Sequence, residues 1–537
     1  MKTKSLLHQI LSEMSVEECI QEMLSPDLRG TTQEFADNIQ AHPTGCIFVS
    51  PRPGDEIPDL IKSLQGQRRT PPLVCADVEK SARHFVPEAA DFPTPMAMGA
   101  ARDPRLIREM AISCARESRA IGINWTLAPV ADINLNFLNC VTNTRSLGDQ
   151  PGIHCDLLQP WIETLQANGL AATAKHFPGD GVDDRDQHLC TSVNSLPMSE
   201  WDATFGRVWK TVIDAGVMAI MPGHISLPAW QGYREDVAEC LPATIDPRLL
   251  IDLLRERLGF QGVIISDAAV MVGLSSRAPE EERIIQFVEA GGDVYLFADP
   301  ERDYQRLLKA FESGRITEER IRESASRIIH LKEQLGLFED PFGPSPETAV
   351  RETAGKTSVE AAEAGLTLLK RDEHFPLDTS RVKKVLTITL SYDNEERPPR
   401  DLEAFDDELR AAGLDVDHHL NLDFRTLRKI AGDYDCVLLN YYVTQHMKMG
   451  TMRLIEHIPF KFWRSFVPDH PCVCHTTFGT PYVEYDLPFI GNLLCTYGPE
   501  ETSQRAAAKA WLGKLTPKGK CPVRLPKTTV QPFTPYR

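Results

Sequence analysis

The chain has 537 residues, of which 42% are hydrophobic and 25% charged, and this composition excludes a disordered chain and a small disulfide-stapled scaffold. Its formal charge of −18 argues against nucleic acid or an anionic membrane as a partner. No apolar run approaches the roughly 18 residues of a membrane-spanning helix, and the N-terminus lacks the apolar core of a secretory signal. We therefore expect a cytoplasmic protein, monomeric or homodimeric.

Over the first 340 residues, short β-branched runs alternate with stretches of helical periodicity, such as Pro104–Ile121 and Pro247–Leu258. This alternation is typical of βα units. Seven units, with no GxGxxG after the first strand, favour a (β/α)8-type TIM barrel over a doubly wound sheet. The expected strands are Thr44–Ser50, Pro72–Asp77, Asn124–Asp132, Leu170–Phe177, Val217–Ile225, Val263–Asp267 and Val294–Asp299.

Polar residues follow the carboxyl ends of five of these strands. A single aspartate there is more often a helix N-cap or a turn former. Five equivalent positions instead match the edge at which barrel enzymes collect their active-site residues. These positions hold Asp77, Asp132, Lys175 with His176, His224 and Asp267.

A Pro- and Gly-rich stretch, Phe338–Pro346, ends the first pattern, and a second α/β pattern follows it. We therefore expect a catalytic barrel domain over 1–345, a linker over 346–356 and a smaller α/β domain over 357–537. The elements expected in the smaller domain are helices Ser358–Gly365 and Glu501–Leu512 and strands Val385–Leu390, Cys436–Tyr442, Pro471–Thr477 and Phe489–Tyr497.

The thirteen cysteines form no CxxC pair and no regular disulfide framework. The pairs His418-His419 and Cys474-His475 have no partner pair at metal-ligand spacing. The sequence therefore predicts no metal and no cofactor. We expect the cysteines within apolar, strand-like runs to be reduced core residues, namely Cys75, Cys436, Cys472 and Cys495.

The segment Lys175–His188 carries the strongest chemical signal. A strand delivers Lys175 and His176, a Pro-Gly turn ends the strand, and an acidic loop closes with Asp186-Gln187-His188. A histidine exchanges protons near neutral pH, and a neighbouring carboxylate fixes its tautomer. The clustered carboxylates of this loop fit a solvated turn or a divalent-cation site equally well, so the residues alone leave these readings open.

A second segment, Gly259–Met271, presents Ser266-Asp267 at the end of an apolar strand, followed by small residues. A carboxylate at this rim can attack an anomeric carbon and form a covalent glycosyl intermediate. The alternative is an N-cap for the helix beyond, which is the commoner role of an isolated Ser-Asp.

These motifs resemble the glycoside hydrolases of family 3. Lys175–His188 is similar to the KHFPGxGxxxxDxH signature of the family's β-N-acetylglucosaminidase branch, and Ser266-Asp267 with Met271 is similar to its nucleophile motif. The resemblance implies a TIM barrel followed by an α/β sandwich domain. Further similar segments are Phe92-Pro93, Ala128–Asp132, Arg145–Gly148, Pro242–Thr244 and Leu366–Lys370.

The resemblance also implies an activity and its residues. It implies an exo-acting, retaining β-N-acetylglucosaminidase that removes terminal non-reducing GlcNAc from chito-oligosaccharides or muropeptides. Asp267 matches the nucleophile, His188 the acid/base and Asp186 the residue that orients His188. The expected sugar-binding residues are Asp77, Arg145, Lys175, His176, Asp132, His224 and Met271.

Two alternatives stay open. A histidine acid/base repels phosphate less than a glutamate does, which permits a phosphorylase that releases GlcNAc-1-phosphate. The segment Asp77–Phe85 lacks two glycines and an arginine that relatives carry, which permits a catalytically silent amino-sugar-binding protein. The joint presence of Asp267, Asp186 and His188 weighs against the silent protein, because a binder needs neither a nucleophile nor a proton-transfer pair.

Overall fold

The computed structural model describes residues 6–52, 56–64, 69–232, 239–392, 401–444, 453–454 and 470–526. The chain divides into two compact units, described separately below. The barrel unit comprises 1–90, 107–133 and 154–354, and the sheet unit comprises 91–106, 134–153 and 355–537. Two segments from the first 345 residues thus belong to the sheet unit, and the expected domain boundaries stay a prediction.

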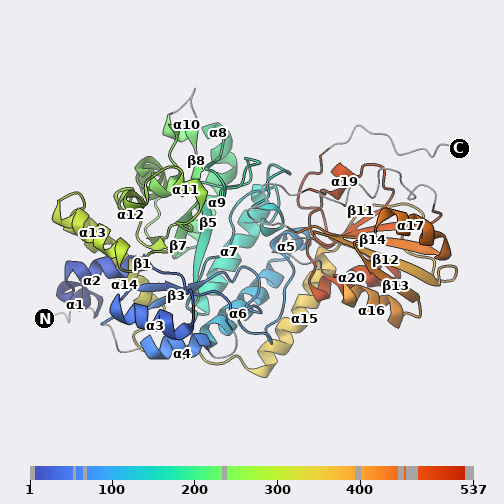
Figure 1. Ribbon diagram of the computed structural model, residues 1–537, viewed down its shortest axis with the longest axis horizontal. Coiled ribbons are helices and arrows are strands. Elements are labelled where there is room, and N and C mark those ends of the chain that lie inside the picture. The colour runs from blue at the N-terminus through green and yellow to red at the C-terminus, as the bar shows by residue number, and fades with distance from the viewer. Residues whose placement is uncertain are drawn as a thin grey trace. The chain divides into compact units, whose positions relative to one another are not determined.

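Eight short parallel strands among the described residues close into a ring in the barrel unit (Figure 1). The order β2-β3-β4-β5-β7-β9 forms one sheet. β1 pairs with β10, and the bridges Asp27–Phe48 and Ile265–Val294 join this pair to the two ends of the sheet. The strands are β1 (Leu24–Ser25), β2 (Cys46–Phe48), β3 (Leu73–Ala76), β4 (Trp125–Thr126), β5 (Ala171–Phe177), β7 (Ala219–Pro222), β9 (Val263–Ile264) and β10 (Tyr295–Leu296).

The closed ring confirms the expected TIM barrel and adds one strand to the seven expected. All seven residues of β5 are buried, because a barrel strand packs side chains into the interior and against the surrounding helices. The strand missing from the expectation is β1, whose two residues follow helix α2 (Val16–Glu22) directly. So short a strand leaves no period-2 pattern to recognise.

Helices separate consecutive strands of the barrel unit. Capping boxes at Ser15–Glu18 and Thr31–Glu34 begin two of them, α2 and α3. The expected helix Pro247–Leu258 is present as a π-helix over Arg248–Arg257. The other helices are α1 (Leu6–Glu13), α3 (Thr32–Ala41), α4 (Glu56–Leu64), α6 (Pro104–Ala120), α7 (Pro151–Ala167), α8 (Met198–Trp201), α9 (Arg207–Asp214), α10 (Pro228–Gln231), α11 (Val272–Ser275), α12 (Glu280–Glu289), α13 (Arg302–Glu312) and α14 (Glu318–Gln334).

The sheet unit is built on a six-stranded sheet with the order β11-β16-β15-β14-β12-β13. Only the β11–β16 pair is antiparallel. One apolar core unites the sheet with α16 and α20, and a second core unites it with α17 (Figure 1). The strands are β11 (Thr367–Lys370), β12 (Lys384–Ser391), β13 (Asp415–Leu420), β14 (Cys436–Tyr442), β15 (Val473–Thr477) and β16 (Leu493–Cys495), and the helices are α5 (Pro95–Ala101), α15 (Thr348–Gly365), α16 (Glu403–Ala411), α17 (Phe424–Ile430), α19 (Val483–Asp486) and α20 (Glu501–Trp511).

Helices on both faces of a mostly parallel sheet confirm the expected α/β sandwich. Helix α15 begins at Thr348 rather than at Ser358 and so covers most of the stretch 346–356 that was expected as a linker. The alanines and glutamates of the second half of α15 favour helix formation, and the helix extends back from them through this stretch. No helix among the described residues is long and apolar enough to span a membrane.

Candidate active site

The strand ends of the barrel unit gather the chemically active side chains at one edge. Asp77 directly follows β3, His176 lies near the end of β5, and Asp267 follows β9 by three residues. Because all the strands are parallel, their carboxyl ends meet at this edge. His176 Nε2 lies 3.9 Å from Asp267 Oδ2, which brings together two positions 91 residues apart in the sequence.

Asp186 and His188 form a hydrogen-bonded pair on the loop after β5. Asp186 Oδ1 lies 2.7 Å from His188 Nδ1 and also accepts the His188 backbone N–H at 2.8 Å. The Asp186 side chain is fully buried, whereas 16% of the His188 side chain is exposed. A carboxylate accepts but does not donate, so Nδ1 carries a proton and Nε2 is left to exchange one. We call this pair the dyad.

Contacts along its whole length anchor the dyad loop. A side chain at Gly179, which has φ of 130°, would meet the Phe205 ring at 2.1 Å, so only glycine fits this turn. Asn194 Nδ2 donates to the Gly179 carbonyl at 3.0 Å. Asp183 accepts hydrogen bonds from the Arg185 guanidinium and from the Val193 N–H.

These bonds also bear on the alternative that the carboxylates of the loop bind a divalent cation. Asp183 is committed to Arg185, and Asp186 is committed to His188. Among the described residues, the carboxylates of this loop do not converge on a common metal position. The bond between Asp186 and His188 supports proton transfer at this loop.

The Asp267 carboxylate is largely buried, with 12% of the side chain exposed. Its Oδ1 accepts the Ala268 N–H at 2.7 Å, and its Oδ2 is buried with no hydrogen-bond partner among the described residues. Burial raises the pKa of this carboxyl, but the neighbouring imidazoles, His176 first among them, and the Ala268 N–H outweigh burial, so the pKa of Asp267 lies below its usual value. Asp267 is therefore ionised at neutral pH, with one oxygen unsatisfied, as a nucleophile requires.

His224 contacts the backbone next to Asp267. It is fully buried; its Nδ1 lies 2.8 Å from Thr244 Oγ1 and its Nε2 lies 3.1 Å from the Ala268 carbonyl. Burial lowers the pKa of His224, so the ring is neutral, with Nε2 donating to the carbonyl and Nδ1 accepting from the threonine. This geometry favours a positioning role for His224 over direct contact with a sugar.

His176 is oriented by Asp132 behind it. Asp132 Oδ2 lies 2.7 Å from His176 Nδ1, and Asp132 Oδ1 accepts the backbone N–H groups of His176 and Asp180. Because Asp132 is completely buried, it acts through His176, whose Nε2 faces Asp267. Asp132 was expected among the sugar-binding residues, and its burial instead favours a positioning role.

The ammonium group of Lys175 lies between two carboxylates. Its Nζ lies 3.0 Å from both Asp77 Oδ1 and Glu79 Oε1, and its side chain is 4% exposed. The Asp77 side chain, by contrast, is 55% exposed and free to meet a ligand. The sequence analysis did not single out Glu79, although an acidic residue two positions after Asp77 shares its face in an extended segment.

Helix α11 is packed against the dyad loop. The Val272 N–H donates to the His188 carbonyl at 3.1 Å, and Thr191 Oγ1 donates to the Gly273 carbonyl at 2.8 Å. A Cβ on Gly273 would lie 2.3 Å from the Gln187 carbonyl oxygen. Met271 is the N-cap residue of α11 and is buried. The segment that carries Asp267 thus holds the segment that carries the dyad.

Arg145 is the one expected sugar-binding residue that is not part of the barrel unit. It belongs to the sheet unit, where it is largely buried and its Nη1 donates to the Val141 carbonyl at 3.3 Å. Its expected role in sugar binding stays a prediction.

The site thus combines an ionised carboxylate, a dyad that can exchange a proton, and a cluster of charged groups in which Asp77 is exposed. The model of the glycosyl hydrolase family 3 N-terminal domain matches residues 15–331. The chain therefore belongs to glycosyl hydrolase family 3, as the motifs predict, and the protein is a glycoside hydrolase.

Individual relatives narrow this class. The β-N-acetylglucosaminidase/β-glucosidase of Cellulomonas fimi is 34% identical, over 86% of this chain and 85% of its own length. A family 3 β-N-acetylglucosaminidase from Paenibacillus sp. str. FPU-7 has a solved structure with a TM-score of 0.85 and 25% identity, over 96% of this chain and all of that one. The solved β-glucoside phosphorylase BglX has a TM-score of 0.87 and 26% identity, over 96% of each chain.

Proposed function

We propose that the protein is an exo-acting, retaining β-N-acetylglucosaminidase that removes terminal non-reducing GlcNAc. The observation that carries this proposal is the pairing of an ionised, largely buried Asp267 with the Asp186–His188 dyad held against the same segment. The names of the Cellulomonas fimi and Paenibacillus relatives support GlcNAc as the sugar.

In the first step, a carboxylate oxygen of Asp267 attacks the anomeric carbon. The bond from that carbon to the leaving oxygen breaks, and the proton on His188 Nε2 passes to the leaving oxygen. The products are a glycosyl ester on Asp267 and a neutral imidazole. Asp186 keeps the Nδ1 proton in place, so Nε2 is the nitrogen that exchanges.

In the second step, neutral His188 Nε2 takes a proton from water, and the water oxygen attacks the anomeric carbon. The ester bond to Asp267 breaks, which restores the carboxylate and the imidazolium. Two displacements at the same carbon retain the β configuration.

The exo mode rests on the charged floor of the site. Asp77, Glu79 and Lys175 form a compact polar group whose most exposed member is Asp77. Charged hydrogen bonds to sugar hydroxyls are strong and directional, and a grip on a terminal hydroxyl excludes a further sugar beyond it. Chito-oligosaccharides and muropeptides both present such an end, and the expected cytoplasmic location and roles in chitin degradation or cell-wall recycling follow from this proposal.

Phosphorolysis is the second candidate. In the second step, a phosphate oxygen could displace Asp267 and release GlcNAc-1-phosphate, and phosphate needs no base because it is already anionic. A neutral imidazole does not repel phosphate as a carboxylate would. The similarity to the solved β-glucoside phosphorylase BglX favours keeping this candidate.

The test is turnover of an aryl β-N-acetylglucosaminide and of the matching glucoside, with and without inorganic phosphate, with the sugar product identified by mass. Free GlcNAc at a rate independent of phosphate supports the hydrolase, and GlcNAc-1-phosphate supports the phosphorylase. Binding of GlcNAc with no cleavage of either substrate would contradict both and leave the silent binder. The matched control is Asp267→Asn, which we expect to lower kcat by a factor on the order of 10³ or more.

A further inference from the structure

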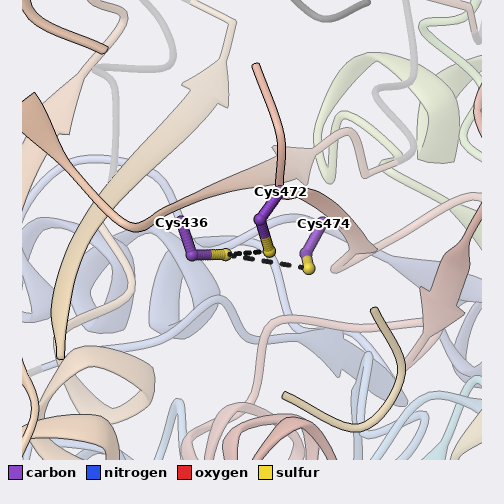
Figure 2. A group of neighbouring side chains, drawn as sticks. All are labelled: Cys436, Cys472 and Cys474. Carbon is purple, nitrogen blue, oxygen red and sulfur yellow. Dashed lines mark hydrogen bonds between the residues drawn. The ribbon is translucent and has the colours of Figure 1, made fainter. Parts of the chain in front are cut away.

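Three cysteines of the sheet unit point toward one another (Figure 2). Cys436 is the first residue of β14, and Cys472 and Cys474 lie at the start of the neighbouring β15. The parallel register pairs Val437 with Val473, which places Cys436 beside Cys472. Residues two apart in a strand share a face, so Cys474 joins the other two on the same side of the sheet.

The three sulfur atoms form a compact group. Cys436 Sγ lies 3.2 Å from Cys472 Sγ and 3.8 Å from Cys474 Sγ, and all three atoms lie within 4.8 Å of one another. Cys436 and Cys474 are fully buried, and Cys472 retains 9% exposure. Apolar packing alone needs no such convergence, because a cysteine in a core packs equally well against carbon.

The spacing of the sulfur atoms fits a metal ion. Zinc–thiolate bonds are about 2.3 Å long, so two thiolates on a tetrahedral ion lie roughly 3.8 Å apart. The Cys436–Cys474 distance of 3.8 Å has this value, and the other two pairs need only small side-chain rotations. Among the described residues the group consists of thiols alone, so its ligands are soft and select zinc(II) or copper(I) over calcium or magnesium.

We propose that Cys436, Cys472 and Cys474 bind one soft metal ion, zinc(II) or copper(I), as thiolates. Binding releases the three thiol protons to solvent. Three thiolates satisfy copper(I), whereas zinc(II) takes a fourth ligand from water. The partial exposure of Cys472 gives the ion its entry.

The ion would tie together the amino ends of two adjacent strands. His470 supports the same corner: its Nδ1 accepts the Cys472 N–H at 3.2 Å, and its Nε2 lies 3.2 Å from the Tyr434 carbonyl. Both ring nitrogens are thereby used, so His470 positions the Cys472 backbone. The metal site stabilises the sheet unit and takes no part in the reaction at the barrel unit.

The test uses the full-length protein, stripped of metal and fully reduced under anaerobic conditions. It is titrated separately with zinc(II) and copper(I), and the bound metal is measured by mass spectrometry after gel filtration. We expect one equivalent of one of these ions per chain, a higher melting temperature on binding, and unchanged hydrolysis of the aryl glycoside.

Variants decide whether the three cysteines hold the ion. Cys436→Ser and Cys472→Ser are expected to lose at least tenfold in affinity, whereas Cys495→Ser, on β16 of the same sheet and outside the group, keeps it. If the variants fail to fold, X-ray absorption at the metal edge of the loaded wild type replaces them, with three sulfur ligands expected at about 2.3 Å for zinc(II).

Two outcomes would overturn the proposal. One is metal binding that is equal in the wild type and in folded Cys436→Ser and Cys472→Ser variants, or absent from the wild type. The other is a protein isolated with a Cys436–Cys472 disulfide, seen as the loss of two hydrogens in the intact mass, because that bond removes two of the three thiolates.

Discussion

The pKa of Asp267 reflects a balance between burial and nearby imidazoles. Burial opposes the charge of the carboxylate, while the His176 imidazole and the Ala268 N–H favour it, and the balance leaves the pKa of Asp267 lowered. His176 Nε2 lies 3.9 Å from Asp267 Oδ2. The ionised nucleophile therefore depends on a neighbour that is itself oriented by Asp132.

This balance predicts a shifted pH profile for His176→Gln. Without the His176 charge, burial dominates and the pKa of Asp267 rises, so the acidic limb of kcat/KM moves to higher pH. The measurement is kcat/KM for an aryl glycoside against pH. His330→Gln, at an exposed position on α14, is the matched control and should leave the limb in place. An unmoved limb in His176→Gln would show that Asp267 does not set it.

The dyad predicts a dependence on the leaving group. In Asp186→Asn, Nδ1 of His188 loses its carboxylate partner, and proton delivery to the leaving oxygen weakens. Turnover of chitobiose, which needs that proton, should fall by about 10²–10⁴. Turnover of a 2,4-dinitrophenyl glycoside, whose leaving group needs little protonation, should fall much less. Equal losses on both substrates would indicate a merely structural role for Asp186.

At the residue scale, the sequence located the groups that sit at strand ends and missed those that support them. Asp267, Asp186 and His188 lie in local motifs whose spacing is visible in the chain. Glu79 reaches Lys175 only because β3 and β5 bring their ends together. The contact of Thr244 with His224 likewise joins segments 20 residues apart, and no local pattern marks it.

At the scale of elements, the junction between α11 and the dyad loop decides whether nucleophile and acid/base keep their spacing. Gly273 packs against the Gln187 carbonyl without room for a side chain. Backbone lies on both sides of this contact, so it cannot yield as a flexible side chain does. The short helix α11 thereby transmits the position of Asp267 to His188.

Gly273→Ala tests this junction. The new methyl group would lie 2.3 Å from the Gln187 oxygen, so the two segments must separate, and we expect kcat/KM to fall by about tenfold to a hundredfold. Gly355→Ala in α15, where a Cβ meets nothing within 4 Å, is the control. It should keep full activity and gain about 0.5–1 kcal/mol of stability. Full activity in a folded Gly273→Ala would contradict the role of the junction.

The elements that the sequence predicted are those with a strong burial pattern. β5 and β14 are buried almost throughout and were expected close to their observed bounds. β13, with the sequence DVDHHL, lies at the edge of its sheet and is mostly solvent-accessible. An edge strand with polar side chains carries little hydrophobic signal, so β13 was not expected.

At the scale of the whole molecule, a buried carboxylate with three arginine partners stabilises the barrel unit. In the barrel unit, the fully buried Asp293 accepts the Ile264 N–H at 2.9 Å and pairs with Arg255, Arg320 and Arg327 at 2.8–3.2 Å. These partners lie on β9, the π-helix after Pro247 and α14. Asp293 thus ties the eighth strand region to the outer helices.

Asp293→Asn should lower the free energy of unfolding by about 3 kcal/mol, because it leaves three partly buried guanidinium groups without their buried carboxylate. Burial raises the pKa of Asp293, but the three arginines and the Ile264 N–H outweigh it and lower that pKa. The stabilisation is therefore complete above the ordinary aspartate pKa and is lost as the pH falls below about 4. Chemical denaturation of both proteins at several pH values should show a difference that narrows in acid.

The central claim is that Asp267 forms the glycosyl ester and His188 resolves it. The most direct measurement is the intact and peptide mass of His188→Ala after reaction with a 2,4-dinitrophenyl β-N-acetylglucosaminide. The activated leaving group departs without an acid, and the missing base slows hydrolysis, so we expect one added GlcNAc on the peptide that contains Asp267, removed by azide. A sugar on any other residue, or no adduct despite rapid release of the phenol and retained product, would contradict the account.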